Sequence, residues 1–182
     1  MVYVFLADGF EETEAVVPID VWRRCGISVT TVGVTGEYVT GSHNITVKAD
    51  ITAQQSDFSD AEAIFLPGGA RGVENLGGSE TVRNAVKRCA DASAYITAIC
   101  AAPSILGEMG LLEGKKATCY PGFEGKLKGA FPSAQPVVVD GKFITGRAAG
   151  AAERFAFTVA ETLAGGEKAA RVFTAMLCEG GA

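Results

Sequence analysis

Three short apolar runs, each ended by a turn signal, constrain the fold more than any other feature of the sequence. They are VYVFLA (2–7), EAIFLPG (62–68) and AYITAIC (94–100). Each run is continuously apolar rather than alternating in polarity, which is typical of strands buried on both faces of a parallel sheet. The chain is therefore expected to form a sheet that is covered on both sides.

Helical patterns lie between these strands. Residues 80–91 and 150–164 each place apolar side chains at i, i+3, i+4 and i+7, and residues 11–25 form a third pattern that stops at Gly26. Alternating strands and helices predict an α/β layered sheet with right-handed crossovers. The chain has no internal repeat, linker or low-complexity tract, so a single domain over 1–182 is expected.

Further strands are predicted outside the three apolar runs. SVTTVGV (28–34) and NITVKA (44–49) read as strands, with a hairpin around Glu37–Tyr38 between them. A second hairpin is expected over 137–146, where Asp140–Gly141 provides the turn.

Composition excludes several classes of function. The net charge is −5 and no Lys/Arg-rich run is present, so nucleic-acid binding has no electrostatic basis. The N-terminal apolar run ends at Asp8, which is too short for a signal peptide or a membrane span. Five cysteines without a C-x-x-C pair predict reduced thiols and a cytoplasmic location, and a single histidine makes a zinc site unexpected.

Candidate site residues gather where the three apolar strands end. The first strand runs into ADGFEETE (7–14), the second into PGGARG (67–72) and the third into Cys100. Ligands of an open parallel sheet collect beyond the carboxyl ends of its strands. We therefore expect these three segments to approach one another on one rim of the sheet.

Cys100 lies in the segment AICAA (98–102). One small residue stands two positions before the thiol and another stands two positions after it, a spacing that resembles the strand–turn–helix elbow of a nucleophile. If a helix begins after Cys100, its free amides and dipole should favour the thiolate, and the Ala101 amide should face the attacked atom. The alternative is a buried structural cysteine, a common role for this residue. Cys25, Cys89 and Cys119 are interpreted as such.

Two further segments fit a reactive thiol. Glu11 and Glu12 are expected to face water in a first helical turn, whereas Glu14 precedes apolar residues and can turn inward to share a proton with the thiol. Gly68–Gly69 permits close backbone approach, and the Gly69 amide with that of Ala101 would form an oxyanion hole. The alternative for the glycines is an ordinary turn. Neither a Walker motif nor G-x-G-x-x-G is present, so a phosphate-bearing cofactor is not expected.

These residues belong to longer blocks, ADGFEETEAVVPIDVWRRCGI, IFLPGGARGVENL and ITAICAAPSIL, with TGRAAGAAERFAFTVAETL as a looser fourth. In this order the blocks resemble the ThiJ/PfpI superfamily, in particular the branch that contains the Parkinson's disease protein deglycase. The resemblance implies a flavodoxin-like three-layer sandwich, with a mostly parallel sheet and a nucleophile elbow, and a homodimer.

The resemblance also implies roles for individual residues. Cys100 would be the oxidation-prone nucleophile and Glu14 its protonated partner, with the Gly69 and Ala101 amides around them. Arg24 and, across the dimer, His43 would lie near the pocket or the interface. Considered alone, His43 in GSHN reads as a surface loop residue.

Tyr120 departs from the pattern of this superfamily, because many members carry a histidine at the matching place before Pro121. A phenol with a pKa of about 10 is a poor base near neutrality, although it can donate a hydrogen bond. Ala101 also stands where protease-like relatives have a histidine, and no histidine follows His43. Peptidase and glutamine amidotransferase activities are therefore disfavoured.

The leading functional hypothesis is a thiol enzyme, free of cofactor and metal, that acts on 2-oxoaldehydes or their early adducts in the manner of a glyoxalase or deglycase. Its partner would be a small reactive carbonyl substrate, with Cys100 as nucleophile and Glu14 as proton shuttle. The main alternative is an oxidative-stress sensor or redox-regulated chaperone that works through oxidation of Cys100. A structural protein with an inert thiol is the third hypothesis.

Overall fold

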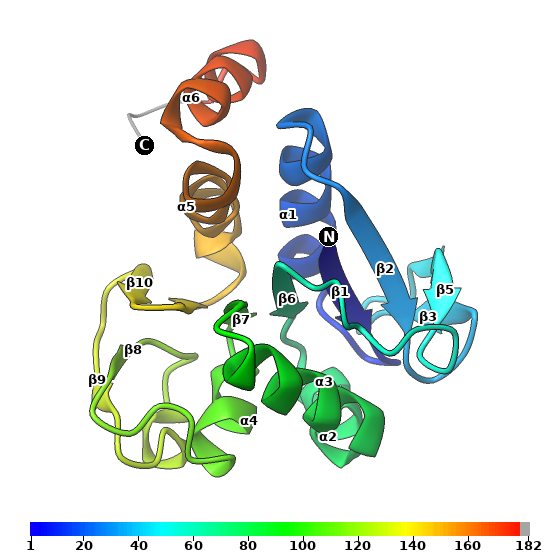
Figure 1. Cartoon of the computed structure of the whole chain (residues 1–182), viewed down its shortest axis with the longest axis vertical. Coiled ribbons are helices and arrows are strands. Elements are labelled where there is room, and N and C mark those ends of the chain that lie inside the picture. The colour runs from blue at the N-terminus through cyan, green and yellow to red at the C-terminus, as the bar shows by residue number, and fades with distance from the viewer. Residues whose placement is uncertain (179–182) are drawn as a thin grey trace.

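The computed structural model describes residues 1–178, in which a seven-stranded sheet lies between two layers of helices (Figure 1). The strand order is β10-β11-β7-β6-β1-β2-β5, and only the β10–β11 pair is antiparallel. This is the flavodoxin-like arrangement that the resemblance implies. The strands are β1 (Val2–Leu6), β2 (Val29–Gly33), β5 (Ile51–Thr52), β6 (Ala63–Leu66), β7 (Tyr95–Ile99), β10 (Val137–Asp140) and β11 (Phe143–Gly146).

The helices divide between the two faces of the sheet (Figure 1). One apolar core lies between the sheet and α1, α5 and α6, and a second lies under α2, α3 and α4. The helices are α1 (Glu12–Arg24), α2 (Ala70–Gly78), α3 (Glu80–Asp91), α4 (Pro103–Glu108), α5 (Ala152–Ala164) and α6 (Gly166–Ala175), with short 3₁₀ turns η1 (Glu124–Lys126) and η2 (Ala149–Ala151).

Buried aromatic packing fixes α1 and α5 against the sheet. The Trp22 indole N–H donates to the Ala156 carbonyl at 2.8 Å, and the ring packs against Phe65 and Phe155. Because the indole has its hydrogen-bond partner, its whole ring can be buried without an unsatisfied donor. This packing sets the position of α1, and with it the position of the first turn of that helix.

The structure confirms the three apolar strands as parallel and the 137–146 segment as a hairpin, but the predicted 28–49 hairpin is wrong. The 28–34 segment enters the central sheet as β2, and Tyr38 lies in a strand rather than a turn. The actual pair is β3 (Tyr38–Thr40) with β4 (Thr46–Lys48). Hydrogen bonds from Thr40 to the end of β1 hold β3 there: Gly9 N donates to the Thr40 carbonyl and Thr40 N to Asp8 Oδ1.

A second small strand pair, β8 (Lys116–Ala117) with β9 (Phe131–Pro132), was not expected from the sequence, and neither were β5, α2 and α6.

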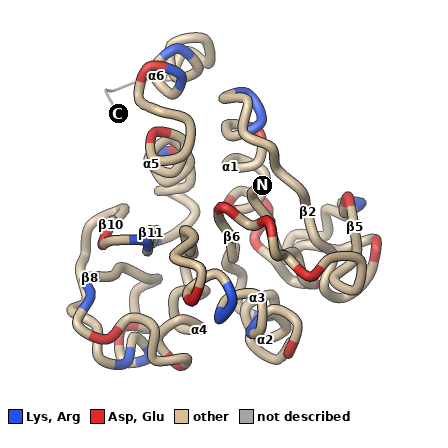
Figure 2. The backbone as a smooth tube through the Cα atoms, viewed as in Figure 1, with Lys and Arg blue, Asp and Glu red and all other residues tan. Residues whose placement is uncertain are grey.

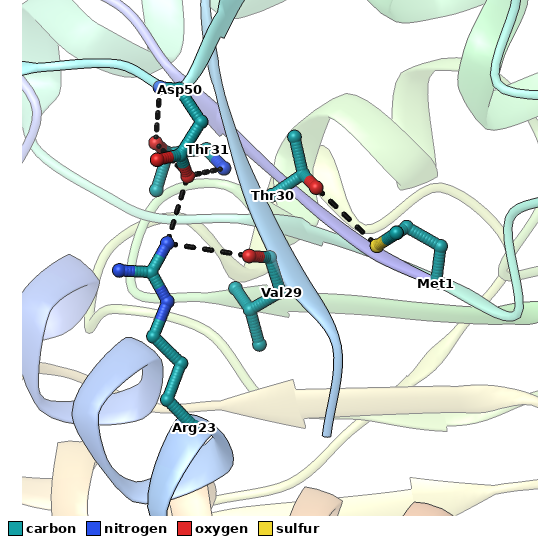
Figure 3. Close-up of polar contacts among 6 residues, drawn as sticks. All are labelled: Met1, Arg23, Val29, Thr30, Thr31 and Asp50. Atoms are coloured by element: carbon teal, nitrogen blue, oxygen red, sulfur yellow. Dashed lines mark hydrogen bonds and ion pairs between the residues drawn. The ribbon is translucent and has the colours of Figure 1, made fainter. Parts of the chain in front are cut away.

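Asp50 ties the edge of the sheet to α1 (Figure 3). Its carboxylate accepts from the Thr31 amide, the Thr31 hydroxyl and the Arg23 guanidinium, each at 2.8 Å, and its own amide donates to Thr31 Oγ1. Arg23 also donates to the Val29 carbonyl. These contacts fasten the C-terminal end of α1, while Glu11 caps its N-terminal end by accepting from the Glu14 amide.

The sheet reverses its winding between β1 and β6. The chain leaves β1 toward α1 on one face, and it leaves β6 toward α2 on the other face. Loops that diverge in this way open a crevice at the carboxyl ends of the two strands, which is the usual ligand position in open α/β sheets.

Charged residues of both signs are dispersed along the chain (Figure 2). Among the residues that the structure describes, no helix is both long enough and apolar enough to cross a bilayer.

Candidate active site

Cys100 lies at a sharp turn between β7 and α4, with φ of +65°. A left-handed conformation is unfavourable for a residue with a side chain, and it persists only where the surroundings impose it. Here the Cys100 amide donates to the Gly146 carbonyl at 2.9 Å, and the Cys100 carbonyl accepts from the Tyr120 amide at 2.7 Å. The turn therefore holds the thiol in the geometry of a nucleophile elbow.

The sulfur atom is surrounded by one carboxyl group and two backbone amides. The Glu14 side chain is hydrogen-bonded to Cys100, and the amides of Gly69 and Ala101 face the sulfur. Cys100 is partly accessible to solvent, unlike Cys25, Cys89 and Cys119, which are buried. The structure thus brings together the three segments that the sequence analysis placed on one rim of the sheet.

Glu14 is 1% exposed although it is charged in its ordinary state. Its Oε2 accepts from the Gly68 amide at 3.0 Å, and the Ala149 amide at the start of η2 also faces it. A Cβ atom on Gly68 would overlap with both Glu14 Oε2 and the Cys100 side chain. Gly68 is therefore required for the carboxyl group and the thiol to meet.

Burial raises the pKa of Glu14 to about 7, and the nearby Glu11 charge acts in the same direction against the hydrogen bonds from Cys100, Gly68 and Ala149. Burial also raises the pKa of the Cys100 thiol to about 12, together with the Glu14 charge and hydrogen bond, while the Gly69 and Ala101 amides oppose this. The amides of Gly69 and Ala101 lower the pKa of Cys100, in the direction that the sequence analysis expected, but burial and then the Glu14 carboxyl group outweigh them, and α4 begins only at Pro103.

Glu14 and Cys100 titrate as a pair, because each pKa depends on the charge of the other group. The first proton leaves the pair near neutrality and the second leaves only at high pH. In the singly charged pair, two backbone amides face each partner. A proton can therefore move from sulfur to carboxylate along their hydrogen bond, which leaves a thiolate beside a neutral acid.

Glu12 is buried, although the sequence analysis placed it in water. Its carboxylate accepts from the His43 amide at 2.7 Å and from Ser42 Oγ at 3.2 Å, and it contacts His43 Nδ1 at 2.9 Å. Burial alone would raise the pKa of Glu12, but the bonds from the His43 ring and amide and one from the Ile45 amide lower it to about 2. Glu12 therefore holds the 41–45 loop against α1.

Glu11, Glu12 and His43 also form the one group of three candidate metal ligands within the described residues, with ligand atoms within 4.8 Å of one another. The Glu12 oxygens in this group already accept several hydrogen bonds from the loop. The hydrogen bonds between Glu12 and the 41–45 loop therefore explain why these three side chains lie together. That the protein works without a metal stays a prediction.

The side chains of the three remaining candidates, Tyr120, Arg24 and His43, are not among the groups that surround the sulfur atom of Cys100. The Tyr120 amide is bonded to Cys100, but its ring is 47% exposed and packs edge-on against Phe123. Arg24 lies at the opposite end of α1 from Glu14 and pairs with Asp20 at 2.8 Å. His43 is in the Glu12 loop. The sequence reasoning missed the Ala149 amide and the role of Glu12, because both depend on contacts between segments that are far apart in the sequence.

Residues 1–162 match the family described as "DJ-1/PfpI family". The Drosophila melanogaster protein dj-1beta is 37% identical over 177 residues, which cover 96% of this chain and 95% of that protein.

Two further relatives bear on function. The structure of oxidized Toxoplasma gondii DJ-1 superposes with a TM-score of 0.94 at 32% identity and covers 98% of both chains. A Pyrococcus abyssi protein named a deglycase is 30% identical over 152 residues, which cover 82% of this chain and 90% of that protein.

Proposed function

The chain belongs to the DJ-1/PfpI family, and on that premise we propose that it is a thiol enzyme acting on 2-oxoaldehydes such as methylglyoxal, or on their early adducts. The observation that carries the proposal is the hydrogen-bonded pair of Glu14 and Cys100 at a left-handed turn, with two amides facing the sulfur. The Pyrococcus abyssi relative named a deglycase supports the same reaction class.

In the first step the proton of the pair moves to Glu14, and the Cys100 thiolate attacks the aldehyde carbon. A C–S bond forms, the carbonyl π bond breaks, and Glu14 donates its proton to the new alkoxide. The product is a hemithioacetal. The amides of Gly69 and Ala101 stabilise the developing oxyanion if the aldehyde oxygen lies near them.

In the second step the Glu14 carboxylate removes the hydrogen of the former aldehyde carbon as a proton and returns a proton to the neighbouring carbon, while the hydroxyl proton of the hemithioacetal passes to the oxygen of that neighbouring carbon. The first carbon is oxidised to the level of a thioester and the second is reduced to an alcohol, so no external redox partner is needed. Water then cleaves the thioester, which releases lactate from methylglyoxal and restores the thiol. Tyr120, which is proposed to line this site, can at most donate a hydrogen bond.

Lactate production from methylglyoxal tests this proposal. Wild type is compared with Cys100→Ser and Glu14→Gln, and we expect kcat/KM to fall by at least about a hundredfold in each. Cys178→Ser is the matched control, because Cys178 is the other partly exposed thiol. Equal lactate production by all four proteins would remove the enzyme hypothesis.

A redox sensor is the second candidate function, and the oxidized state of the Toxoplasma gondii structure favours it. Peroxide would oxidise the Cys100 thiolate to a sulfenic acid and then to a sulfinic acid, with water or hydroxide as the product of each reduction of peroxide. A protonated Glu14 would donate to the sulfinate. Mild peroxide treatment followed by peptide mass spectrometry should find Cys100 oxidised first, whereas an even distribution over all five cysteines would contradict the sensor.

A homodimer is proposed with either function. Val16 on α1 and Ile45 in the Glu12 loop are 47% and 56% exposed, which suits an apolar contact between copies. Arg24 and His43 are proposed to lie near such an interface. Sedimentation of wild type and Val16→Glu tests this, since a monomeric wild type at micromolar concentration would exclude the dimer.

A further inference from the structure

A cavity of about 510 Å³ lies beside the thiol site but is separate from it. Its walls are the end of β1, the start of α2 and the loop that follows β3, and neither Cys100 nor Glu14 lines it. The packing of Gly9 against Gly69 separates the two sites, since a Cβ on Gly69 would overlap with the Gly9 carbonyl. The volume is within the range of small-molecule sites.

The cavity occupies the crevice between the loops that leave β1 and β6. Asp8 and Gly9 follow β1, and Ala70 and Arg71 follow β6. These two strands are neighbours whose helices pack on opposite faces of the sheet. Sheets of this architecture bind ligands at this reversal point, so the position itself favours a binding site.

Asp8 is held in place before any ligand arrives. Its amide donates to Thr35 Oγ1 at 3.1 Å, its carbonyl accepts from Asn75 Nδ2 at 2.8 Å, and its Oδ1 accepts from the Thr40 amide at 2.9 Å. The second carboxylate oxygen makes no hydrogen bond or ion pair within the described part of the chain. A preorganised acceptor of this kind binds a cation with little loss of entropy.

Arg71 lines the same cavity from the first turn of α2 and is exposed. Within residues 1–178 it takes part in no ion pair within 4.0 Å, so it does not neutralise Asp8. Asn44 also lines the cavity, and the Ala70 and Arg71 amides at the start of α2 have no acceptor within their own helix, whereas the Gly72 amide already donates to the Gly9 carbonyl. These donors favour an anionic group at this end of the cavity.

We propose that this cavity binds a free α-amino acid, with the ammonium group against Asp8 and the carboxylate against Arg71, Asn44 and the start of α2. An opposite pair of charges that share a cavity without pairing matches a small zwitterion. A simple carboxylic acid would be repelled by Asp8, and a simple amine by Arg71, so each half of the ligand is disfavoured alone. This site is independent of the proposed thiol chemistry.

Isothermal titration calorimetry at neutral pH tests the proposal. The probes are L-alanine, L-glutamate and L-lysine, which share the two backbone charges, together with propionate and ethylamine, which carry one each. At least one amino acid should give a saturable isotherm, with both single-charge probes weaker by about tenfold or more. Failure of all three amino acids to bind, or equal binding of propionate or ethylamine, would overturn the zwitterion site.

Matched variants locate the binding. Asp8→Asn keeps the acceptor for the Thr40 amide and removes the charge, and Arg71→Gln removes the cation; each should raise Kd by about tenfold. Asp91→Asn and Arg154→Gln change exposed charges elsewhere and should leave Kd unchanged. Cys100→Ser should bind as wild type does. An unchanged Kd in Asp8→Asn or Arg71→Gln, with a native melting temperature, would place the ligand elsewhere and refute the assignment.

Discussion

Glu12 and Glu14 lie in the same turn of α1, both are buried, and their pKa values move in opposite directions. The pKa of Glu12 falls to about 2 and that of Glu14 rises to about 7. Burial raises the pKa of both, but Glu14 is the more deeply buried of the two, and their partners differ as well. Glu12 accepts from a loop that supplies the His43 amide and ring and the Ser42 hydroxyl, whereas Glu14 has two amides and a thiol.

This difference assigns a structural role to one carboxylate and a chemical role to the other. A carboxylate with a full set of donors stays charged and holds its loop, but it has no proton to give near neutrality. A carboxyl group whose donors do not offset its burial keeps its proton to a higher pH and can exchange it with the neighbouring sulfur. Each lies against a glycine, because a Cβ on Gly41 would overlap with Glu12 just as one on Gly68 would overlap with Glu14.

The largest expected effect is on the pH dependence of stability. The folded pKa of Glu14 is raised from 4.5 to about 7, so its stabilising contribution is present below about pH 4.5 and is lost as pH rises through 7. Relative to Glu14→Gln, the free energy of unfolding of wild type should fall by about 3 kcal/mol over this range. Urea unfolding at several pH values measures it, and parallel curves for the two proteins would contradict the raised pKa.

Gly68→Ala should separate Glu14 from Cys100, because the added methyl group takes the space where they meet. We expect lactate production to fall by about a hundredfold, with about 1–3 kcal/mol lost from stability through overpacking. Gly78→Ala is the control, since a Cβ at that position has no neighbour within 4 Å. Retained activity in Gly68→Ala would show that the contact is not needed.

Glu12→Gln should destabilise the protein by about 2 kcal/mol at pH 7, because charge-assisted hydrogen bonds become neutral ones. The pKa of Glu12 is lowered, so its contribution is present above about pH 4.5 and is lost as pH falls toward 2. The gap between wild type and Glu12→Gln should therefore close in acid, opposite to the behaviour of Glu14. Lactate production per folded molecule should change little, and a loss as large as that of Glu14→Gln would erase the distinction between the two carboxylates.

Tyr120→Phe should have the smallest effect. The ring is half exposed and contacts Phe123, while the bond to Cys100 uses the backbone amide, which phenylalanine keeps. We expect kcat/KM to change by less than about twofold. A tenfold loss would instead assign the phenol a role in the reaction.

The sequence predicted the parallel strands and the α3 and α5 helices well, because a continuous apolar run or a regular apolar stripe reports burial directly. It also predicted that the ends of β1, β6 and β7 meet, since parallel strands deliver their carboxyl ends to one rim. It failed for β3, where the strand at Tyr38–Thr40 is held by bonds to Asp8 and Gly9 rather than by its own pattern.

Within the site, the sequence could place Glu14 inward because apolar residues follow it, but the same reasoning put Glu12 in water. Glu12 is buried only because a loop 30 or so residues later folds over it, as its bond from His43 spans 31 positions. The pKa of Cys100 was likewise out of reach, since it depends on how deeply the fold buries the thiol and on its contact with Glu14. Long-range contacts of this kind leave no local signal.

The left-handed backbone at Cys100 lowers the thermal stability of the protein in order to position the thiol. A glycine would adopt that conformation without penalty, so substitution there could relieve strain of about 1 kcal/mol while eliminating the chemistry. Lineages selected only for durability would therefore tend to discard this cysteine early. Its retention in a descendant of this chain would be a record that the sulfur was still in use.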